Sequence, residues 1–457
     1  MNLNDVISDF EQRKLHIDFL EMSLTQNKSG VKVISYTGKG YVEQTDDDVL
    51  FLKMYVNETA NTSLFDEFKN LNQTKSGELY PDDSYYTLSG IAADGTTWKA
   101  EHVLPACKWH VQHPNPIVDA RLSSITGGEL ARDPKSLEMH FFEKADLPVL
   151  SRKARFTVGR YDFHVEGGDD SFIIGADSDV PLPEHFGMRI EEALRFLLAQ
   201  SVTPRAIVQH HSVLLLTSTT PKSPVVRLGR PISRGSAAFH DKSWDLFGAY
   251  LVFVTEKTKF GNWHPCTGYL HMAREASANS LDAWAIGIAV AVEGLARLVN
   301  IEHDTAEDEK RNAERKRLKD LQTFIVEQVS SQECLKRYTD RVKGIVSSLT
   351  SVRAIDRLFW LADHGGAERS HVNAWRKLRN RGVHPATTED KDIASLDYQE
   401  LVDEVHSVTI LLYHIVFHVI AYDGPYTDYG TRNFPVKKYP LVSPSPENDG
   451  GTRDHQG

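Results

Sequence analysis

The amino-acid sequence predicts an α+β protein in which a β-rich N-terminal domain, sandwich or barrel-like, precedes an all-α helical bundle. Short β-branched and aromatic runs, separated by turn residues, fill about the first 230 residues. After about residue 240, apolar residues recur with helical spacing. The end of the chain has almost no apolar residues and is typical of disorder. We therefore expect domains at 1–235 and 236–425, and a mostly disordered tail at 426–457.

The predicted strands of the first domain are short and are punctuated by polar turns. Two of the expected turns, Gly38-Lys39-Gly40 and Asp94-Gly95, separate neighbouring strand-like runs. One helix interrupts the series at 183–198, where apolar residues are spaced as on one helix face. Short strands with this spacing favour an antiparallel sandwich or barrel-like domain. The clearest strands cover 31–36, 49–56, 155–158 and 171–174.

The second half of the chain has the pattern of long amphipathic helices. Trp244, Phe247, Leu251 and Val254 recur at helical spacing and begin the series. Four or five long helices joined by short loops are typical of an antiparallel bundle. The remaining predicted helices cover 283–298, 307–346, 351–363, the segment from 370 onward, and 396–422.

The composition indicates a soluble protein of the cytoplasm. The 457 residues are 40% hydrophobic and 25% charged, which excludes a largely disordered or fibrous chain. The net charge is −11, so any nucleic-acid contact must come from a local basic patch. Three widely spaced cysteines fit a reducing compartment. We find no apolar core of a signal peptide and no run of roughly 20 apolar residues, and therefore expect no membrane partner.

Several common catalytic motifs are absent from the sequence. It has no P-loop, no G-x-G-x-x-G, no H-E-x-x-H, no G-x-S-x-G and no C-x-x-C. These absences argue against a P-loop ATPase, the usual dinucleotide enzymes, a zincin protease and an α/β hydrolase.

One segment combines local positive charge with groups suited to RNA chemistry. From Arg369 through Thr388 there are basic residues and no acidic one, the charge needed to meet a phosphate backbone. Arg379 and His384 lie five residues apart, about 140° around an ideal helix. We expect the helix to unwind near Gly382, before Pro385, so that the imidazole turns toward the guanidinium. A histidine can move the proton of a ribose 2′-hydroxyl, while an arginine holds phosphate oxygens.

The motif Arg379-Asn380-x-x-x-His384 on a helical bundle resembles the R-x4–6-H signature of HEPN domains, over about residues 240–425. The resemblance implies a metal-independent endoribonuclease that needs no cofactor and forms its site at a homodimer interface. It implies that Arg379 stabilises the phosphate, His384 is the acid and base, and Asn380 orients the site. Glu293, which ends an apolar run, matches the acidic residue that often lies near the motif. The remaining basic residues are assigned to RNA binding: Arg376, Lys377 and Arg381.

A β-rich domain before a HEPN domain is also similar to the ApeA family of bacterial anti-phage abortive-infection ribonucleases. The loose pattern Gly40-Tyr41…Val49-Leu50-Phe51-Leu52, then Leu88-Ser89-Gly90, carries this second resemblance. It implies a protein that cleaves cellular RNA, with tRNA as one candidate. In that role the N-terminal domain senses a phage-derived trigger.

A non-catalytic alternative stays open at this point. Arg379 and His384 can simply end a helix, where cations interact favourably with the dipole, while the basic face is solvated. The chain is then a non-catalytic protein whose β domain binds a ligand or partner and whose bundle only dimerises.

Two weaker histidine patterns have spacings that suit a metal. Cys107-x-x-His110-x-x-His113 has zinc-type ligands but no evident fourth one. His414 and His418 share a helix face, inside an apolar run where hydrogen-bonded core histidines are favoured. We therefore predict no metal site.

Overall fold

The computed structural model confirms the α+β class. It describes residues 2–28, 33–60, 77–110, 112, 114–128, 134–209, 213–218, 226–301, 305–347, 352–383 and 398–441. The chain divides into two compact units, Met1–Ser223 with Val254–Asn262, and Pro224–Phe253 with Trp263–Gly457. The boundary lies about ten residues before the predicted position at 235, because the segment ahead of the first long helix packs with the helices. There the Tyr413 hydroxyl donates to the Gly229 carbonyl.

The first unit is built on one antiparallel sheet of fourteen described strands, with helices α1 (Leu3–Glu11) and α3 (Phe186–Leu198). The predicted strands 49–56, 155–158 and 171–174 lie in β3, β10 and β12, and the predicted helix is α3. Residues 31 and 32 of the remaining predicted strand lie outside the described residues, and β2 begins at Ser35. The strands are β1 (His16–Gln26), β2 (Ser35–Gln44), β3 (Leu50–Ala60), β4 (Tyr86–Ala92), β5 (Thr97–Val103), β6 (Ala106–Lys108), β7 (Ile117–Leu122), β8 (Ser124–Gly127), β9 (Ser136–Phe141), β10 (Lys153–Val158), β11 (Tyr161–Gly167), β12 (Phe172–Asp177), β13 (Ala206–Gln209) and β14 (Val213–Thr217).

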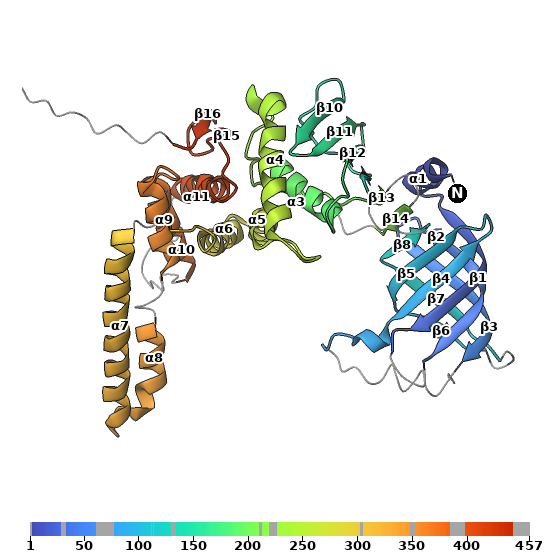
Figure 1. Ribbon diagram of the computed structural model, residues 1–457, viewed down its shortest axis with the longest axis horizontal. Helices are drawn as coiled ribbons and strands as arrows, with labels where there is room; N and C mark the ends of the chain where they lie inside the picture. The colour runs from blue at the N-terminus through green and yellow to red at the C-terminus, as the bar shows by residue number, and fades with distance from the viewer. Residues whose placement is uncertain are drawn as a thin grey trace, which may run out of the picture. The chain divides into compact units, whose positions relative to one another are not determined.

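The part of this sheet from β1 to β8 curls around one core (Figure 1). Strand β7 pairs with β3, whereas β8, which follows after Ser123 alone, pairs with β5. The continuous stretch through β7 and β8 therefore joins both sides of the curled sheet, as in a small barrel. Alternate residues of the longer strands point inward and are buried, and Leu24, Leu52 and Leu88 are fully buried.

Helix α3 covers the part of the sheet formed by β9 to β12. Its Gly187 faces Leu137 and Met139 of β9. Arg189 and Glu192 form a buried ion pair at 2.5 Å, with side chains 2% and 0% exposed. The Arg189 guanidinium also donates to the Asn262 carbonyl at 2.7 Å, which ties residues 254–262 to this unit.

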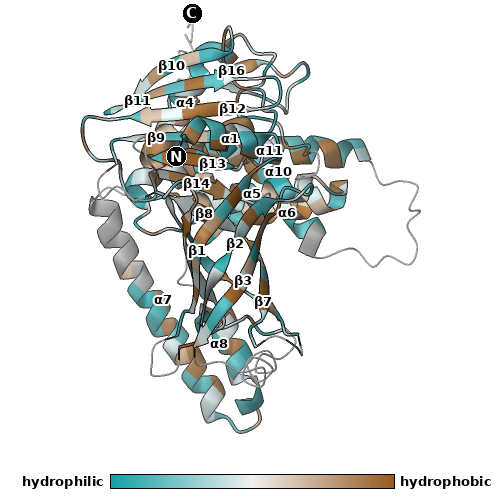
Figure 2. Ribbon diagram, turned by 90° about the vertical axis from the view of Figure 1, so that its right-hand side faces the viewer, coloured by the Kyte–Doolittle hydropathy of each residue, from teal (hydrophilic) through white to brown (hydrophobic). Residues whose placement is uncertain are grey.

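The second unit is the predicted helical bundle. Helices α6, α9, α10 and α11 pack against one another, α5 packs on α6, and α8 folds back on α7 (Figure 1). Both α7 and α8 carry hydrophilic and hydrophobic residues along their exposed length (Figure 2). The helices are α4 (Ala238–Lys257), α5 (Pro265–Ser277), α6 (Leu281–Ala296), α7 (Thr305–Ser331), α8 (Thr339–Ser347), α9 (Ala354–Asp363), α10 (Arg369–Val383) and α11 (Tyr398–Val419).

Part of the predicted disordered tail is folded. Strands β15 (Gly424–Thr427) and β16 (Val436–Tyr439) pair as an antiparallel hairpin after α11. Tyr426 and Tyr439 are buried and pack on the His414 ring, with ring centroids 4.8 and 5.5 Å away. The prediction for 426–441 was therefore wrong, because two aromatic anchors outweigh a polar composition. Residues 442–457 lie outside the described residues.

Candidate active site

Helix α10 carries the predicted motif and is anchored by its apolar side. Val372, Trp375 and Leu378 follow helical spacing and are all buried. The Trp375 indole Nε1 donates a hydrogen bond to the Ala289 carbonyl of α6 at 2.9 Å. Because α10 packs against both α6 and α11, its remaining faces are left to polar residues. The helix position is thus set by packing, and the charged residues are presented from a rigid element.

Helix α6 supplies the partner for the motif arginine. The helix begins after Ser280, whose hydroxyl accepts a hydrogen bond from the Ala283 amide at 3.1 Å. Near its end, a Cβ at Gly294 would overlap the Tyr269 ring of α5, so the glycine permits close helix contact. Glu293 lies beside this contact and keeps 32% of its side chain exposed.

Arg379 and Glu293 form the central contact of the site. Arg379 Nε donates to Glu293 Oε2 at 2.7 Å, and Nη2 lies 3.4 Å from Oε1. Four residues earlier on each helix, Trp375 meets Ala289, so two successive contacts fix the register of α10 on α6. The hydrogen bond to Glu293 raises the pKa of Arg379, and 42% of the arginine side chain stays exposed. The carboxylate therefore orients a cation that still reaches solvent.

Two of the predicted site residues lie on the outer face of α10. Arg376 and Asn380 are exposed and lie one turn apart, between the faces that meet α6 and α11. Within the described part of the chain, no carboxylate lies within 4 Å of Arg376. Asn380 adjoins Arg379 in sequence, and its exposed amide is available to a ligand.

The other two basic residues of the motif face α11. Lys377 lies 3.6 Å from Glu400 and 3.9 Å from Glu404. Arg381, one turn later, lies 3.8 Å from Glu400 and 3.6 Å from Glu404. We call these four residues the charge quartet. The two glutamates are not predicted from the sequence, although their i, i+4 spacing matches that of the two cations.

Glu404 is the least exposed member of the charge quartet. Its side chain is 7% exposed, and neither carboxylate oxygen has a hydrogen-bond partner among the described residues. Burial raises the pKa of the Glu404 carboxyl even though two cations lie nearby. The local positive charge expected from the sequence is therefore offset in space by carboxylates from α6 and α11.

His384 and the segment after it, to residue 397, lie outside the described residues. Helix α10 ends at Val383, one residue after Gly382, around which the sequence predicted its end. The other members of the motif, Arg379 and Asn380, lie on α10 beside Glu293 of α6. The role of His384 stays a prediction.

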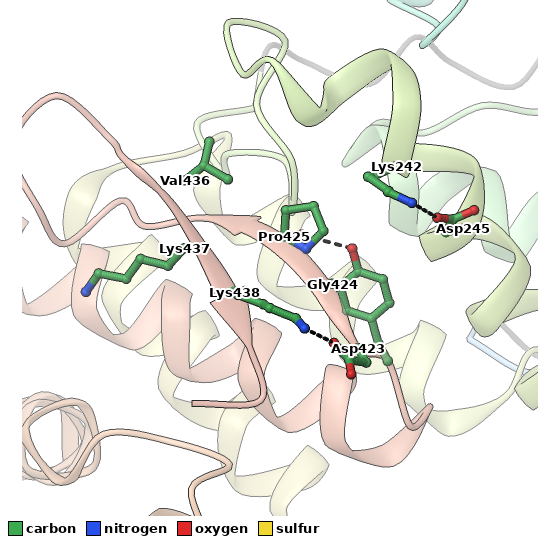
Figure 3. A pocket seen from close by; sticks show the side chains of 9 residues that line it. Lys242, Asp245, Asp423, Gly424, Pro425, Val436, Lys437 and Lys438 are labelled. Carbon is green, nitrogen blue, oxygen red and sulfur yellow. Dashed lines mark hydrogen bonds and ion pairs between the residues drawn. The ribbon is translucent and has the colours of Figure 1, made fainter. Parts of the chain in front are cut away.

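A pocket of about 440 Å³ lies between the start of α4 and the β15–β16 hairpin (Figure 3). Its lysines are matched by carboxylates. Lys242 pairs with Asp245 at 3.0 Å and Lys438 pairs with Asp423 at 3.1 Å. In Figure 3, Lys437 points away from the other two lysines, and it pairs with Asp428 outside the pocket lining. The balance of charge gives this pocket no preference for an anion.

The other histidine patterns belong to other elements of the chain than α10. Cys107 is in β6, and His113 lies outside the described residues. His414 is fully buried, as expected, but its two ring nitrogens have no hydrogen-bond partner among the described residues. Burial lowers the pKa of His414 to about 3. No group of three metal-ligating side chains occurs in the described ranges.

No helix of the described residues has the length and apolar character needed to cross a membrane. No family model matches the chain, and no curated protein and no solved structure is found to be similar to it. The site must therefore be interpreted from its own chemistry.

Proposed function

We propose that the chain is a cytoplasmic, metal-independent endoribonuclease of the HEPN type. The observation that carries the proposal is the contact between Arg379 and Glu293. It keeps a half-exposed guanidinium oriented at the edge of a polar helix face, next to Asn380 and one turn from Arg376. An oriented guanidinium is suited to a phosphodiester, because it donates two parallel hydrogen bonds to the non-bridging oxygens.

The proposed reaction uses the ribose of the substrate as the nucleophile. His384 takes the proton of the 2′-hydroxyl, and the resulting oxygen attacks the adjacent phosphorus. The bond from phosphorus to the 5′-oxygen breaks, and that oxygen takes a proton from the histidine of the partner protomer. Arg379 stabilises the negative charge that develops on the phosphoryl oxygens. The products are a 2′,3′-cyclic phosphate and a 5′-hydroxyl, and no metal or cofactor is needed.

A homodimer is part of the proposal, and the surface of α6 supports it. Ile286 and Val290 lie one turn apart and are 50% and 49% exposed. They share a helix face that leads toward Glu293, so an apolar strip borders the charged site. Apolar residues in such a position, with a polar rim, are typical of a protein interface. A second copy on this strip brings two motifs together.

In the cell, we propose a role in anti-phage abortive infection. The barrel-like unit senses a phage-derived trigger, and the helical unit then cleaves cellular RNA, with tRNA as one candidate. The layout of a β-rich unit followed by the helical unit supports this division of roles.

Cleavage of total bacterial RNA and of tRNA, with EDTA present, tests the proposal. We expect the wild type to cut and His384→Ala and Arg379→Ala to lose cutting. His240→Ala, an exposed histidine of α4, is the matched control and should cut like the wild type. If wild type and His384→Ala give the same biological effect during phage infection, the ribonuclease proposal fails. The non-catalytic role, in which the bundle only dimerises, then stands.

A further inference from the structure

The charge quartet places two carboxylates where the proposed function needs free cations. Lys377 and Arg381 are 65% and 40% exposed, so both can reach a phosphate in solvent. Each also has two carboxylates within 4 Å, at 3.6 to 3.9 Å. The two cations and two carboxylates sum to zero, so this edge of α10 has no net positive charge.

We propose that Glu400 and Glu404 are internal counter-ions that RNA phosphates must displace from Lys377 and Arg381. The inference rests on the proposed function and names residues that set its affinity for RNA. Two phosphates replace two carboxylates, and no covalent bond changes. Glu400 and Glu404 therefore weaken binding of any RNA, whatever its sequence.

The long separations in the charge quartet favour replacement of the carboxylates by phosphate over a permanent structural ion pair. All four separations exceed 3.5 Å, which is longer than a charge-assisted hydrogen bond between nitrogen and oxygen. The two pairs with the half-exposed Glu400 are of the weak surface type and are screened by salt. A phosphate that approaches from solvent can make shorter bonds with the same two cations.

Glu404 differs from an ordinary surface carboxylate in ways that support this role. It is buried beneath the two cations, and no described residue donates a hydrogen bond to it. Its charge is therefore fixed in place and cannot turn away into solvent. A negative charge fixed here makes the electrostatic potential at Lys377 and Arg381 less positive. The effect is the same for every RNA that approaches.

RNA binding by the full chain tests the inference. The background is His384→Ala, so that the RNA stays intact. The variant Glu400→Gln with Glu404→Gln is compared with Asp403→Asn with Glu256→Gln. This matched control removes two exposed carboxylates that have no ion pair with Lys377 or Arg381. The probe is a single-stranded RNA of about 20 nucleotides, and its Kd is measured between about 50 and 200 mM salt.

We expect the quartet variant to bind roughly five to ten times more tightly at about 50 mM salt. The slope of log K against log salt should change little, because both proteins neutralise the same two phosphates and release the same RNA counter-ions. The gain should vanish when Lys377→Ala and Arg381→Ala are added. The two-charge control should show at most a small gain from the change in net charge.

The other results of the binding experiment separate a failure of the counter-ion inference from a failure of the RNA function. If the quartet variant and the protein with Glu400 and Glu404 bind RNA with equal affinity, the counter-ion inference is overturned and the proposed function is untouched. If neither binds RNA, the RNA function is overturned, and the inference falls with it. Should the double variant not fold, Glu400→Gln alone, at a half-exposed position, must bind RNA roughly two to three times more tightly than the protein with Glu400.

Discussion

Replacing Glu293 by Gln should separate the stability of the helical unit from the function of its site. The substitution keeps the size of the side chain and removes its charge. Arg379 and Glu293 are 42% and 32% exposed, and ion pairs in such positions contribute about 0.2–1 kcal/mol. The free energy of unfolding should therefore fall by less than about 1 kcal/mol. For a unit of this size, that loss lowers the Tm by no more than about 4 °C.

The effect of Glu293→Gln on RNA cleavage should be larger than its effect on stability. The 2.7 Å bond from Arg379 to Glu293 orients the guanidinium. A misoriented guanidinium loses its own hydrogen bond to the phosphoryl oxygen, and a hydrogen bond to a charged group contributes about 1.5–3 kcal/mol. Loss of that bond to the substrate slows cleavage by roughly 10- to 150-fold.

Single-turnover cleavage and thermal unfolding measure the two effects. Arg379→Lys keeps the charge but loses the planar donor pair, so it should slow cleavage by a similar factor. The double variant should be little slower than either single variant, because both changes break one contact. Wild-type cleavage by a folded Glu293→Gln protein would refute the idea that the carboxylate positions the arginine.

Three further predictions concern the stability of the fold. Trp375→Phe removes the donor to the Ala289 carbonyl and should destabilise the helical unit by about 0.5–1.5 kcal/mol in thermal unfolding. Glu192→Gln leaves Arg189 buried without its counter-charge, and chemical denaturation should show a loss of about 3–5 kcal/mol; a change below 1 kcal/mol would contradict the buried pair. His414 is held neutral in the folded state with a pKa of about 3, below its unfolded value of 6.5, so stability is present above pH 6.5 and is lost as the pH falls. By pH 4.5 that loss is on the order of 3 kcal/mol, and His414→Leu should abolish this part of the acid sensitivity in unfolding titrations.

The local structure of the chain follows from its sequence, but the long-range pairing does not. Runs such as 49–56 and 155–158 predict strands, because β-branched and aromatic residues alternate there. Closure of the curled sheet depends on which strands meet β7 and β8, and those partners lie far away in sequence. The hairpin of β15 and β16 was missed for a different reason. Its polar, Pro- and Gly-containing composition hides the two tyrosines that bury against His414.

The candidate site was predicted in part. The pairing of Arg379 with Glu293 was expected from the family resemblance, and the structure brings these residues together. The role of Glu400 and Glu404 was not expected, because no local pattern shows that α11 returns alongside α10. Basic residues that are clustered in sequence can thus face carboxylates from a later helix.

The chemistry of the cut ends tests the central claim most directly. Purified wild-type protein and His384→Ala should be incubated with RNA in EDTA, and the terminal groups of the fragments identified by mass spectrometry. The proposed reaction predicts 2′,3′-cyclic phosphate and 5′-hydroxyl ends from the wild type, and no fragments from His384→Ala. Fragments with 3′-hydroxyl and 5′-phosphate ends, or equal cutting by both proteins, would contradict it.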